Sequence, residues 1–502
     1  MTTYVDLLLD ALRDGGDHEV LVDHDRRVSA AEAHDTVLRL ANALRGHGVG
    51  KGDAVAVITG NTSDGILVWF ALHLLGARLI LTPFDEAAGE RGTFLRRAGT
   101  DVIVYDETGA ELAPEGGARL LLTVDDLLRR AATCPATRPD GCAGRDDVST
   151  VFHTGGTTGR PKMVLHGHPY YDVMVFGADR RYFTFPPPNR FLVMTPLTHT
   201  SGQICVVVTL LSGGTVVLLD SFEPGAFIDT VRRERVSAVM LVPAMLYELL
   251  DHPDMPADGL GLARVNYGGA PASPVRLREA LRRFGPVLRQ TYALTEVPTI
   301  AVLPPEEHDE SAPGRLASCG KPIPLVEVVL RDDGRDVAPG EVGEVCVRGS
   351  IVMTEYWKDP ELTAETVRDG WFHTGDLGTF DEDGYLHLVG RRSDTIITGR
   401  RELGVYLTHI YPRLLEDVLN AVPGVRSCAA VGAPDEAYGE AAHVFVVPGP
   451  DLSADPADLR KRVVEELGPV YEPRTITYVE GLPYTPFGKV DRKALRRMIE
   501  SA

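Results

Sequence analysis

Residues 53–83 contain three successive patterns that decide the fold: DAVAVITG (53–60), ILVWFALHLLG (66–76) and ARLILTP (77–83). The first and third are short apolar runs of the kind found in buried strands. The middle run is longer and ends at a glycine, which is typical of a helix. Strand, helix and strand in close succession form a βαβ unit, so we expect an α/β fold with a parallel sheet.

The same alternation continues on both sides of this unit. The opening residues 1–16 predict an amphipathic helix, and Ser29-Ala-Ala-Glu32 predicts a capping box at the start of a helix that ends near Arg45. Further strand and helix patterns follow at RFLVMTP (190–196), GTVVLLD (214–220), FIDTVRRERV (227–236) and SAVMLVP (237–243). These patterns predict a large layered N-terminal domain with parallel sheets.

Two later regions have a different character. Residues 327–349 and 384–390 place tight-turn dipeptides between β-branched runs, which predicts a smaller antiparallel region. The last hundred or so residues mix strand patterns (427–433 and 441–449) with a helix pattern (458–467), which is enough for a small, mobile α+β domain. We place the boundary so that the N-terminal domain covers 1–392 and the C-terminal domain covers 393–502.

Length and composition exclude several classes of protein. A chain of 502 residues is too long for one core, and 51 basic against 71 acidic residues give a net charge of -20, which argues against a nucleic-acid or anionic-membrane surface. The most apolar stretch, 205–220, is interrupted at 212–214 and predicts two buried elements. The start has no basic segment of a signal peptide, and the six cysteines have no CxxC spacing, so we expect reduced thiols in a cytoplasmic protein.

Residues 151–164, VFHTGGTTGRPKMV, form a candidate phosphate-binding loop. Glycines let the backbone approach an anion closely, while hydroxyls, amides and a lysine supply hydrogen-bond donors and charge. Arg160-Pro161-Lys162 breaks the Gly-Lys-Ser/Thr ending of a Walker A loop, so the loop is of another type. The residues that we expect to contact phosphate are Thr154, Gly155, Gly156, Thr157, Thr158, Gly159 and Lys162.

The segment TGGTTGRPK resembles the phosphate loop of the adenylate-forming superfamily, which includes acyl- and aryl-CoA ligases, peptide-synthetase adenylation domains and firefly luciferase. Gly155 stands where that family has serine, and Met163 where it has glycine. Further segments resemble family motifs in the family's order, over nearly the whole chain: PLTHTSG (196–202), YGGAP (267–271), QTYALTE (290–296), HTGDLG (373–378), GRRSD (390–394) and PYTPFGK (483–489).

This resemblance implies an ATP-dependent, AMP-forming ligase that uses Mg²⁺ and releases pyrophosphate. It implies adenine contacts from Gly268, Gly269, Ala270 and Tyr292, and ribose contacts from Asp376 and Arg391. It implies a catalytic group of Thr295 on a phosphate, Glu296 on Mg²⁺, His199 at the acyl pocket and Lys489 from the C-terminal domain. The physics agrees: a carboxylate attacking a phosphate brings two anions together, so positioned cations are needed.

The resemblance places the acyl pocket at the helix after the His199 segment and near Tyr267 and Leu294. The pocket candidates are Thr200, Ser201, Gln203, Val207, Asn266, Leu294 and Thr299. No Asp or Glu occurs between Pro196 and Leu219 to pair with an ammonium group, which disfavours an α-amino acid. We expect a small aromatic or short polar-substituted carboxylic acid, with Gln203 or Asn266 contacting a hydroxyl or amino substituent.

The acceptor of the acyl group is less constrained. Ser393 replaces the family's hinge aspartate, Arg400 replaces a glycine, and extra residues lie between Gly399 and Ile410. Transfer to the thiol of CoA or of a phosphopantetheine carrier protein is the first hypothesis. A non-thiol acceptor such as an amine, an unusual oxyanion substrate such as nitrite, and a nucleotide-binding protein without turnover are the alternatives. We expect a monomer or homodimer without a nucleic-acid or membrane partner.

Overall fold

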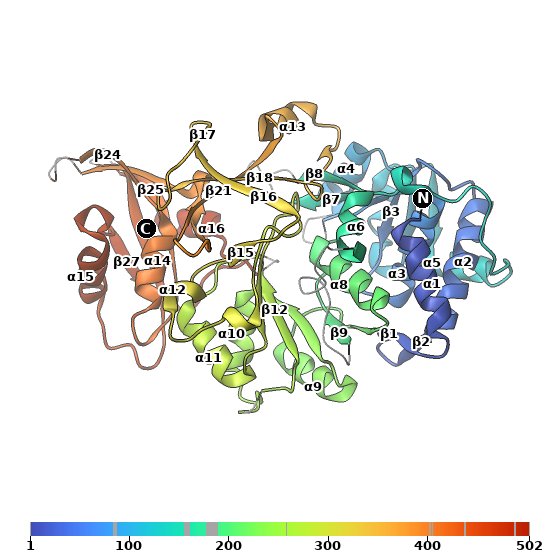
Figure 1. Ribbon diagram of the computed structural model, residues 1–502, viewed down its shortest axis with the longest axis horizontal. Coiled ribbons are helices and arrows are strands. Elements are labelled where there is room, and N and C mark those ends of the chain that lie inside the picture. The colour runs from blue at the N-terminus through green and yellow to red at the C-terminus, as the bar shows by residue number, and fades with distance from the viewer. Residues whose placement is uncertain are drawn as a thin grey trace.

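A computed structural model describes residues 2–83, 88–154, 161–176, 189–257, 259–400, 403, 405–435, 438–485 and 488–500. Of the residues predicted to bind phosphate, Gly155, Gly156, Thr157, Thr158 and Gly159 lie outside this part of the chain. The described part contains four sheets, and Figure 1 shows the N-terminal helices at one end of the molecule and the C-terminal sheet at the other.

A seven-stranded sheet contains the βαβ unit from which the fold was predicted. Helix α3 (Ser63–Leu75) joins two neighbouring parallel strands, β3 and β4, as the sequence indicates. The antiparallel partner of β7 is β8, and their register sets Thr154 opposite Lys162. In sheet order the strands are β19 (Glu355–Tyr356), β8 (Lys162–Gly167), β7 (Ser149–Thr154), β4 (Arg78–Ile80), β3 (Ala54–Ile58), β5 (Val102–Tyr105) and β6 (Leu120–Thr123).

A nine-stranded sheet forms the second layer of the N-terminal part. Its central strands run parallel, while β14 and β15 at one edge and β2 at the other are antiparallel to their neighbours. In sheet order the strands are β15 (Lys321–Pro322), β14 (Ala301–Leu303), β13 (Leu288–Tyr292), β12 (Arg264–Gly268), β11 (Ala238–Leu241), β9 (Arg190–Val193), β10 (Thr215–Leu218), β1 (Glu19–Asp23) and β2 (Arg26–Ser29).

Helices surround these two sheets. The apolar stretch 205–220 forms two buried elements as predicted, because α8 ends at Leu211 and β10 begins at Thr215. The predicted capping box of α2 is only half formed: Ser29 accepts from the Glu32 amide, but the Glu32 carboxylate lies 3.8 Å from Arg26 instead of bonding back to the Ser29 amide. The helices are α1 (Tyr4–Gly15), α2 (Ala30–Gly46), α4 (Ala88–Ala98), α5 (Val124–Ala131), α6 (His168–Phe176), α8 (Thr200–Leu211), α9 (Pro224–Glu234), α10 (Pro243–Asp251), α11 (Pro274–Phe284), α12 (Pro313–Leu316) and α13 (Pro360–Thr366).

The two smaller sheets confirm the predicted antiparallel region and α+β segment. The first contains β17 (Arg335–Asp336), β16 (Val326–Asp332), β18 (Gly343–Gly349), β21 (Trp371–Phe380), β20 (Val367–Arg368) and β22 (Leu386–Arg391). The second contains β24 (Val405–Ile410), β23 (Ile396–Arg400), β26 (Gly439–Pro448), β25 (Val425–Asp435) and β27 (Thr475–Tyr478), with helices α14 (Pro412–Asn420), α15 (Pro456–Leu467) and α16 (Arg492–Glu500). The boundary at 392/393 itself stays a prediction.

All six cysteines are free thiols, as predicted. Across the described ranges, none of the helices is both long enough and apolar enough to span a membrane.

Candidate active site

The pairing of β8 with β19 brings Lys162, Tyr356 and Glu296 together. The hydroxyl of Tyr356 donates to Oε1 of Glu296 at 2.7 Å, and Nζ of Lys162 lies 5.1 Å from the centre of the Tyr356 ring. Burial and the Glu296 charge raise the pKa of Tyr356 well above its ordinary value, so its hydroxyl remains a donor. Sequence reasoning missed Tyr356, because nothing local to EYW indicates a glutamate sixty positions away as its partner.

The pairing of β21 with β22 sets Asp376 opposite Arg391. Nε of Arg391 lies 2.9 Å from Oδ1 of Asp376, and the Tyr292 hydroxyl donates to Oδ2 at 2.6 Å. Asp376 is buried, while the Arg391 side chain is 45% exposed. Both carboxylate oxygens therefore have a donor that fixes their direction, and each keeps a further lone pair for a ligand.

Lys489 comes from the C-terminal part and lies within electrostatic range of Arg391, Asp376 and Glu296. Burial and then the Arg391 charge lower its pKa, against the opposing effect of the two carboxylates. The residue as a whole is exposed to solvent, so the lowering of its pKa reflects protein atoms gathered around the amine and not burial of the entire side chain. The site thus unites groups that are far apart in the sequence.

Backbone hydrogen bonds with Thr485 fix the position of Lys489. Its amide donates to Oγ1 of Thr485, and its carbonyl accepts from the Thr485 amide at 2.7 Å. Gly488 has φ +69°, and a Cβ there would lie 2.6 Å from the Val242 side chain. Glycine is therefore favoured just before the lysine, because the Gly488 backbone lies directly against Val242 at the start of α10.

His199 caps α8 and lies close enough to Lys489 to sense its charge. Nδ1 accepts from the Ser201 amide at 3.2 Å and lies 2.8 Å from Oγ of Ser201, so the ring proton is on Nε2. Burial, helped by the Lys489 charge, lowers the pKa of His199 to about 4. The imidazole is therefore neutral at physiological pH.

The strand end at Gly268, Gly269 and Ala270 is shaped for close backbone approach. A Cβ on Gly268 would lie 2.3 Å from the Thr291 carbonyl oxygen, and Gly269 has φ +79°. Thr295, further along, accepts from Nε2 of His166 through its carbonyl at 2.8 Å. Glycine is required at both positions, which leaves the turn without side chains that would obstruct a planar ring.

The two polar pocket candidates, Asn266 and Gln203, differ in which atoms of their side-chain amides are bonded to protein. The Asn266 amide donates to the Val239 carbonyl, and its oxygen lies 3.5 Å from an Arg289 nitrogen, so both of its ends are engaged by protein. Gln203 accepts from the Tyr171 hydroxyl at 3.1 Å. Of the other candidates, Thr299 bonds the Pro298 carbonyl, Ser201 contacts His199, Thr200 and Val207 are buried, and Leu294 is half-buried.

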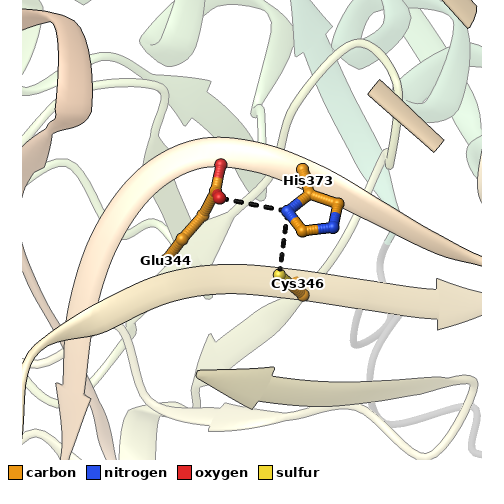
Figure 2. Close-up of side chains that lie close together, drawn as sticks. All are labelled: Glu344, Cys346 and His373. Atoms are coloured by element: carbon orange, nitrogen blue, oxygen red, sulfur yellow. Dashed lines mark hydrogen bonds and ion pairs between the residues drawn. The ribbon is translucent and has the colours of Figure 1, made fainter. Parts of the chain in front are cut away.

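A second cluster lies beside the Asp376 strand and includes Glu344, Cys346 and His373 (Figure 2). Nδ1 of His373 is 3.0 Å from Oε2 of Glu344 and 3.4 Å from Sγ of Cys346. A divalent cation there would meet two guanidinium groups, since Arg368 lies 2.8 Å from the same Nδ1 and Arg392 lies 3.5 Å from Glu344. Glu344 also accepts from the Gly375 amide, so we interpret the cluster as support for the strand that carries Asp376.

Two family models match the chain. Residues 9–357 match AMP-binding enzyme, and residues 414–489 match the AMP-binding enzyme C-terminal domain. The chain belongs to the AMP-binding enzyme family. This confirms the recognition and fold class predicted from the sequence, and with them an ATP-dependent, AMP-forming ligase that uses ATP and Mg²⁺.

Relatives within the AMP-binding enzyme family share nearly the full length of the chain. A medium/long-chain-fatty-acid–CoA ligase of Mycobacterium tuberculosis is 34% identical over 98% of this chain and 89% of its own. A feruloyl-CoA synthase of an Amycolatopsis species is 35% identical over 96% of each chain. The structure of an amide bond synthetase from Marinactinospora thermotolerans is 34% identical, with a TM-score of 0.86 over 98% of this chain and 99% of its own. The main functional prediction, adenylation of an acid and transfer to a thiol, agrees with the two CoA ligases.

Proposed function

We propose that the protein adenylates a small carboxylic acid, aromatic or short and polar-substituted, and passes the acyl group to the thiol of CoA or of a carrier protein. One observation carries this proposal: Lys489 lies within electrostatic range of Glu296, Asp376, Arg391 and His199. A nucleotide-binding protein without turnover has no need of a lysine brought to this place by a distant segment.

In the first half-reaction an acid oxygen attacks the α-phosphorus of ATP, and the bond to the bridging oxygen of pyrophosphate breaks. Lys489 neutralises charge on the α-phosphate, while Asp376 and Arg391 hold the ribose. Gly268, Gly269, Ala270 and Tyr292 contact adenine, and Thr154, Lys162 and Thr295 contact phosphates. These roles rest on the resemblance together with the geometry above.

The site suits a magnesium ion. Glu296 is buried, and Tyr356 occupies only one of its oxygens, which leaves a hard oxygen ligand of the kind that Mg²⁺ takes beside substrate phosphates. When bound, Mg²⁺ offsets phosphate charge. Lys162, 5.1 Å from the Tyr356 ring, adds a fixed positive charge at the same place.

In the second half-reaction a thiol sulfur attacks the acyl carbonyl, AMP leaves, and the thiol proton is lost to solvent. We propose that the C-terminal domain, 393–502, turns at Ser393 between the two half-reactions. Three ion pairs support this position: Arg392 faces Glu344 of the N-terminal part, whereas Asp394 faces both Arg492 and Arg496 of α16.

A second candidate is transfer to an amine, with amide formation and release of AMP. It is favoured by the similarity to an amide bond synthetase over essentially the whole of both chains. Ser393 and Arg400, where the sequence departs from the family pattern, are compatible with a different acceptor. Nitrite activation has no comparable observation in its support.

The test measures pyrophosphate release with ATP, Mg²⁺ and a panel of aryl and short polar acids, each with no acceptor, with CoA or with an amine. Acid-dependent release accelerated by CoA, with a thioester detected by mass spectrometry, supports the first candidate, whereas an amide formed only with the amine supports the second. Lys489→Ala should abolish pyrophosphate release while ATP binding persists. Lys493 is an exposed lysine on α16, and Lys493→Ala should leave pyrophosphate release unchanged. Full activity of Lys489→Ala would contradict the proposal.

We further propose a cytoplasmic monomer or homodimer without nucleic-acid or membrane partners. Light scattering on the purified protein measures its mass directly.

A further inference from the structure

A continuous chain of buried hydrogen bonds runs from the N-terminal helices to Gln203. Nδ1 of His73 lies 2.6 Å from the Tyr4 hydroxyl and accepts from the Trp69 indole at 3.0 Å. Nε2 of His73 lies 3.2 Å from Oγ1 of Thr150, which lies 2.7 Å from the Tyr171 hydroxyl. Tyr171 donates to Oε1 of Gln203 at 3.1 Å. Four helices and one strand (α1, α3, β7, α6 and α8) contribute to the chain.

The direction of each proton in this chain is determined at the Trp69 end. An indole N–H can only donate, so Nδ1 of His73 is the acceptor and the ring proton is on Nε2. Burial lowers the pKa of His73 to about 3, which keeps the ring neutral. Nε2–H then faces the Ser149 carbonyl and the Thr150 hydroxyl, so Thr150 cannot give its hydrogen to His73. We assign that hydrogen to Tyr171, whose own hydrogen goes to Gln203.

This polarity fixes the orientation of the Gln203 amide. An amide can normally turn its oxygen or its nitrogen toward a hydroxyl, but here Tyr171 has only a donor to offer. The oxygen therefore faces Tyr171, and the NH₂ group faces away from it. Within the described ranges, Nε2 of Gln203 has no protein acceptor, although the side chain is only 1% exposed. An unpaired buried amide is costly, so a ligand acceptor is the natural partner.

Gln203 lies one helical turn from His199 on α8, since its amide donates to the His199 carbonyl at 3.3 Å. His199 in turn senses the charge of Lys489. We propose that the acid activated by this enzyme carries a hydrogen-bond acceptor, such as a ring nitrogen or a carbonyl or ether oxygen, that receives the Gln203 amide, and that the relay from Trp69 and His73 enforces this choice. The inference rests on the proposed function and narrows its substrate class.

This relay, the hydrogen-bond chain from Trp69 and His73 to Gln203, also predicts which substituents the pocket rejects. An amine or N–H donor opposite the Gln203 NH₂ group would leave two donors facing each other without water, and a plain C–H would leave the amide unpaired. Asn266 cannot compensate, because both ends of its amide are engaged by protein. Mismatch of a buried polar group of this kind costs about 10- to 100-fold in specificity.

The experiment compares acids of equal shape by acid-dependent ATP–pyrophosphate exchange. In the first pair, a quinoline carboxylic acid has an acceptor nitrogen where the matching naphthoic acid has a C–H. In the second pair, a benzofuran carboxylic acid has an acceptor oxygen where the matching indole carboxylic acid has a donor N–H. Each pair is tested with the carboxylate at every ring position. The full-length enzyme should favour the acceptor member of the best pair by about 10- to 100-fold in kcat/KM. Gln203→Met and Gln203→Leu should lower kcat/KM for the acceptor acid and bring the pair to within about threefold.

The relay predicts an opposite effect for Tyr171→Phe. Without the Tyr171 hydroxyl the amide can turn over, so the donor acid should gain about tenfold while the acceptor acid changes little. The matched control is Tyr170→Phe. The Tyr170 hydroxyl bonds the Thr200 carbonyl at 3.3 Å and not Gln203, so this variant should rank the acids as the wild type does. An unchanged ranking in Gln203→Met with exchange intact would overturn this inference alone. Absence of exchange with every acid of the panel would overturn the proposed function with it.

Discussion

The Tyr356 hydroxyl holds one oxygen of the buried Glu296 carboxylate at 2.7 Å. The geometry depends on two parts of the fold, because Tyr356 pairs with β8 through the register Tyr356–Val164, and the Glu296 carbonyl accepts from the Met353 amide at 2.8 Å. A hydrogen bond to a charged carboxylate is stronger than a hydrogen bond between two neutral groups. Tyr356 is thus a positioning residue for the group that we assign to Mg²⁺.

We predict that Tyr356→Phe raises the Mg²⁺ concentration needed for half-maximal pyrophosphate release and lowers kcat/KM for ATP by about 10-fold or more, because the carboxylate loses its charge-assisted donor. A Mg²⁺ titration of the initial rate measures both. Tyr385→Phe is the control: its hydroxyl also lies beside a glutamate, Glu307, but away from this site. Equal Mg²⁺ dependence of the two variants would refute the role of Tyr356.

The lowered pKa of Lys489 predicts the pH dependence of the first half-reaction. The ammonium is present below its pKa and is lost as pH rises, and burial together with Arg391 lowers that pKa from 10.5. The alkaline decline in kcat/KM for ATP should therefore begin below pH 10.5. The neutral imidazole of His199, with a pKa of about 4, contributes no titration in this range.

Lys489→Arg tests this assignment. A guanidinium keeps its charge throughout the accessible range, so the alkaline decline should move to higher pH, while the rate falls because the planar group is placed differently. A pH profile of pyrophosphate release for both proteins provides the comparison. If the decline stays at the same pH in Lys489→Arg, another group is titrating.

Local patterns sufficed to predict most of the architecture. The run 66–76 is apolar except for His73, and 66–75 are buried in α3, while Gly76 adopts the left-handed conformation that ends the helix. The resemblance of the local motifs to those of the family, in the family's order, sufficed to nominate Glu296, Asp376, Arg391 and Lys489. These features depend on residues within a few positions of one another, which a sequence displays directly.

The partners of those residues could not be predicted, because they come from pairings between distant strands. Tyr292 was expected only to contact adenine, yet its hydroxyl holds Asp376, 84 positions away. Likewise, Gln203 and Asn266 seemed equivalent as pocket amides. Only the structure distinguishes an amide engaged at both ends from one held at its oxygen alone.

The substitution Gly268→Ala tests how closely the strands pack behind the proposed adenine site. An added Cβ would lie 2.3 Å from the Thr291 carbonyl oxygen, so strands β12 and β13 would have to separate. We expect Gly268→Ala to destabilise the protein by about 1–3 kcal/mol, seen as a lower thermal midpoint, and to raise the KM for ATP. Gly50→Ala is the control, since a Cβ there has nothing within 4 Å. An unshifted midpoint for Gly268→Ala would show that the strands have room.

The substitution Asp376→Asn tests the proposed ribose contact most directly. Arg391 and Tyr292 fix its two oxygens at 2.9 and 2.6 Å, so the carboxylate presents its remaining lone pairs in a set direction. Asp376→Asn should lower kcat/KM for ATP by about 10- to 100-fold, because the hydrogen bonds lose their charged acceptor. It should also reduce discrimination against 2′-deoxy- and 3′-deoxy-ATP, measured as a ratio of kcat/KM values. Asp381→Asn, which removes an exposed carboxylate bonded to His387, should leave that ratio unchanged. If Asp376→Asn lowered the rate for all three nucleotides equally, the aspartate would be holding Arg391 and Tyr292 in place without contacting the ribose.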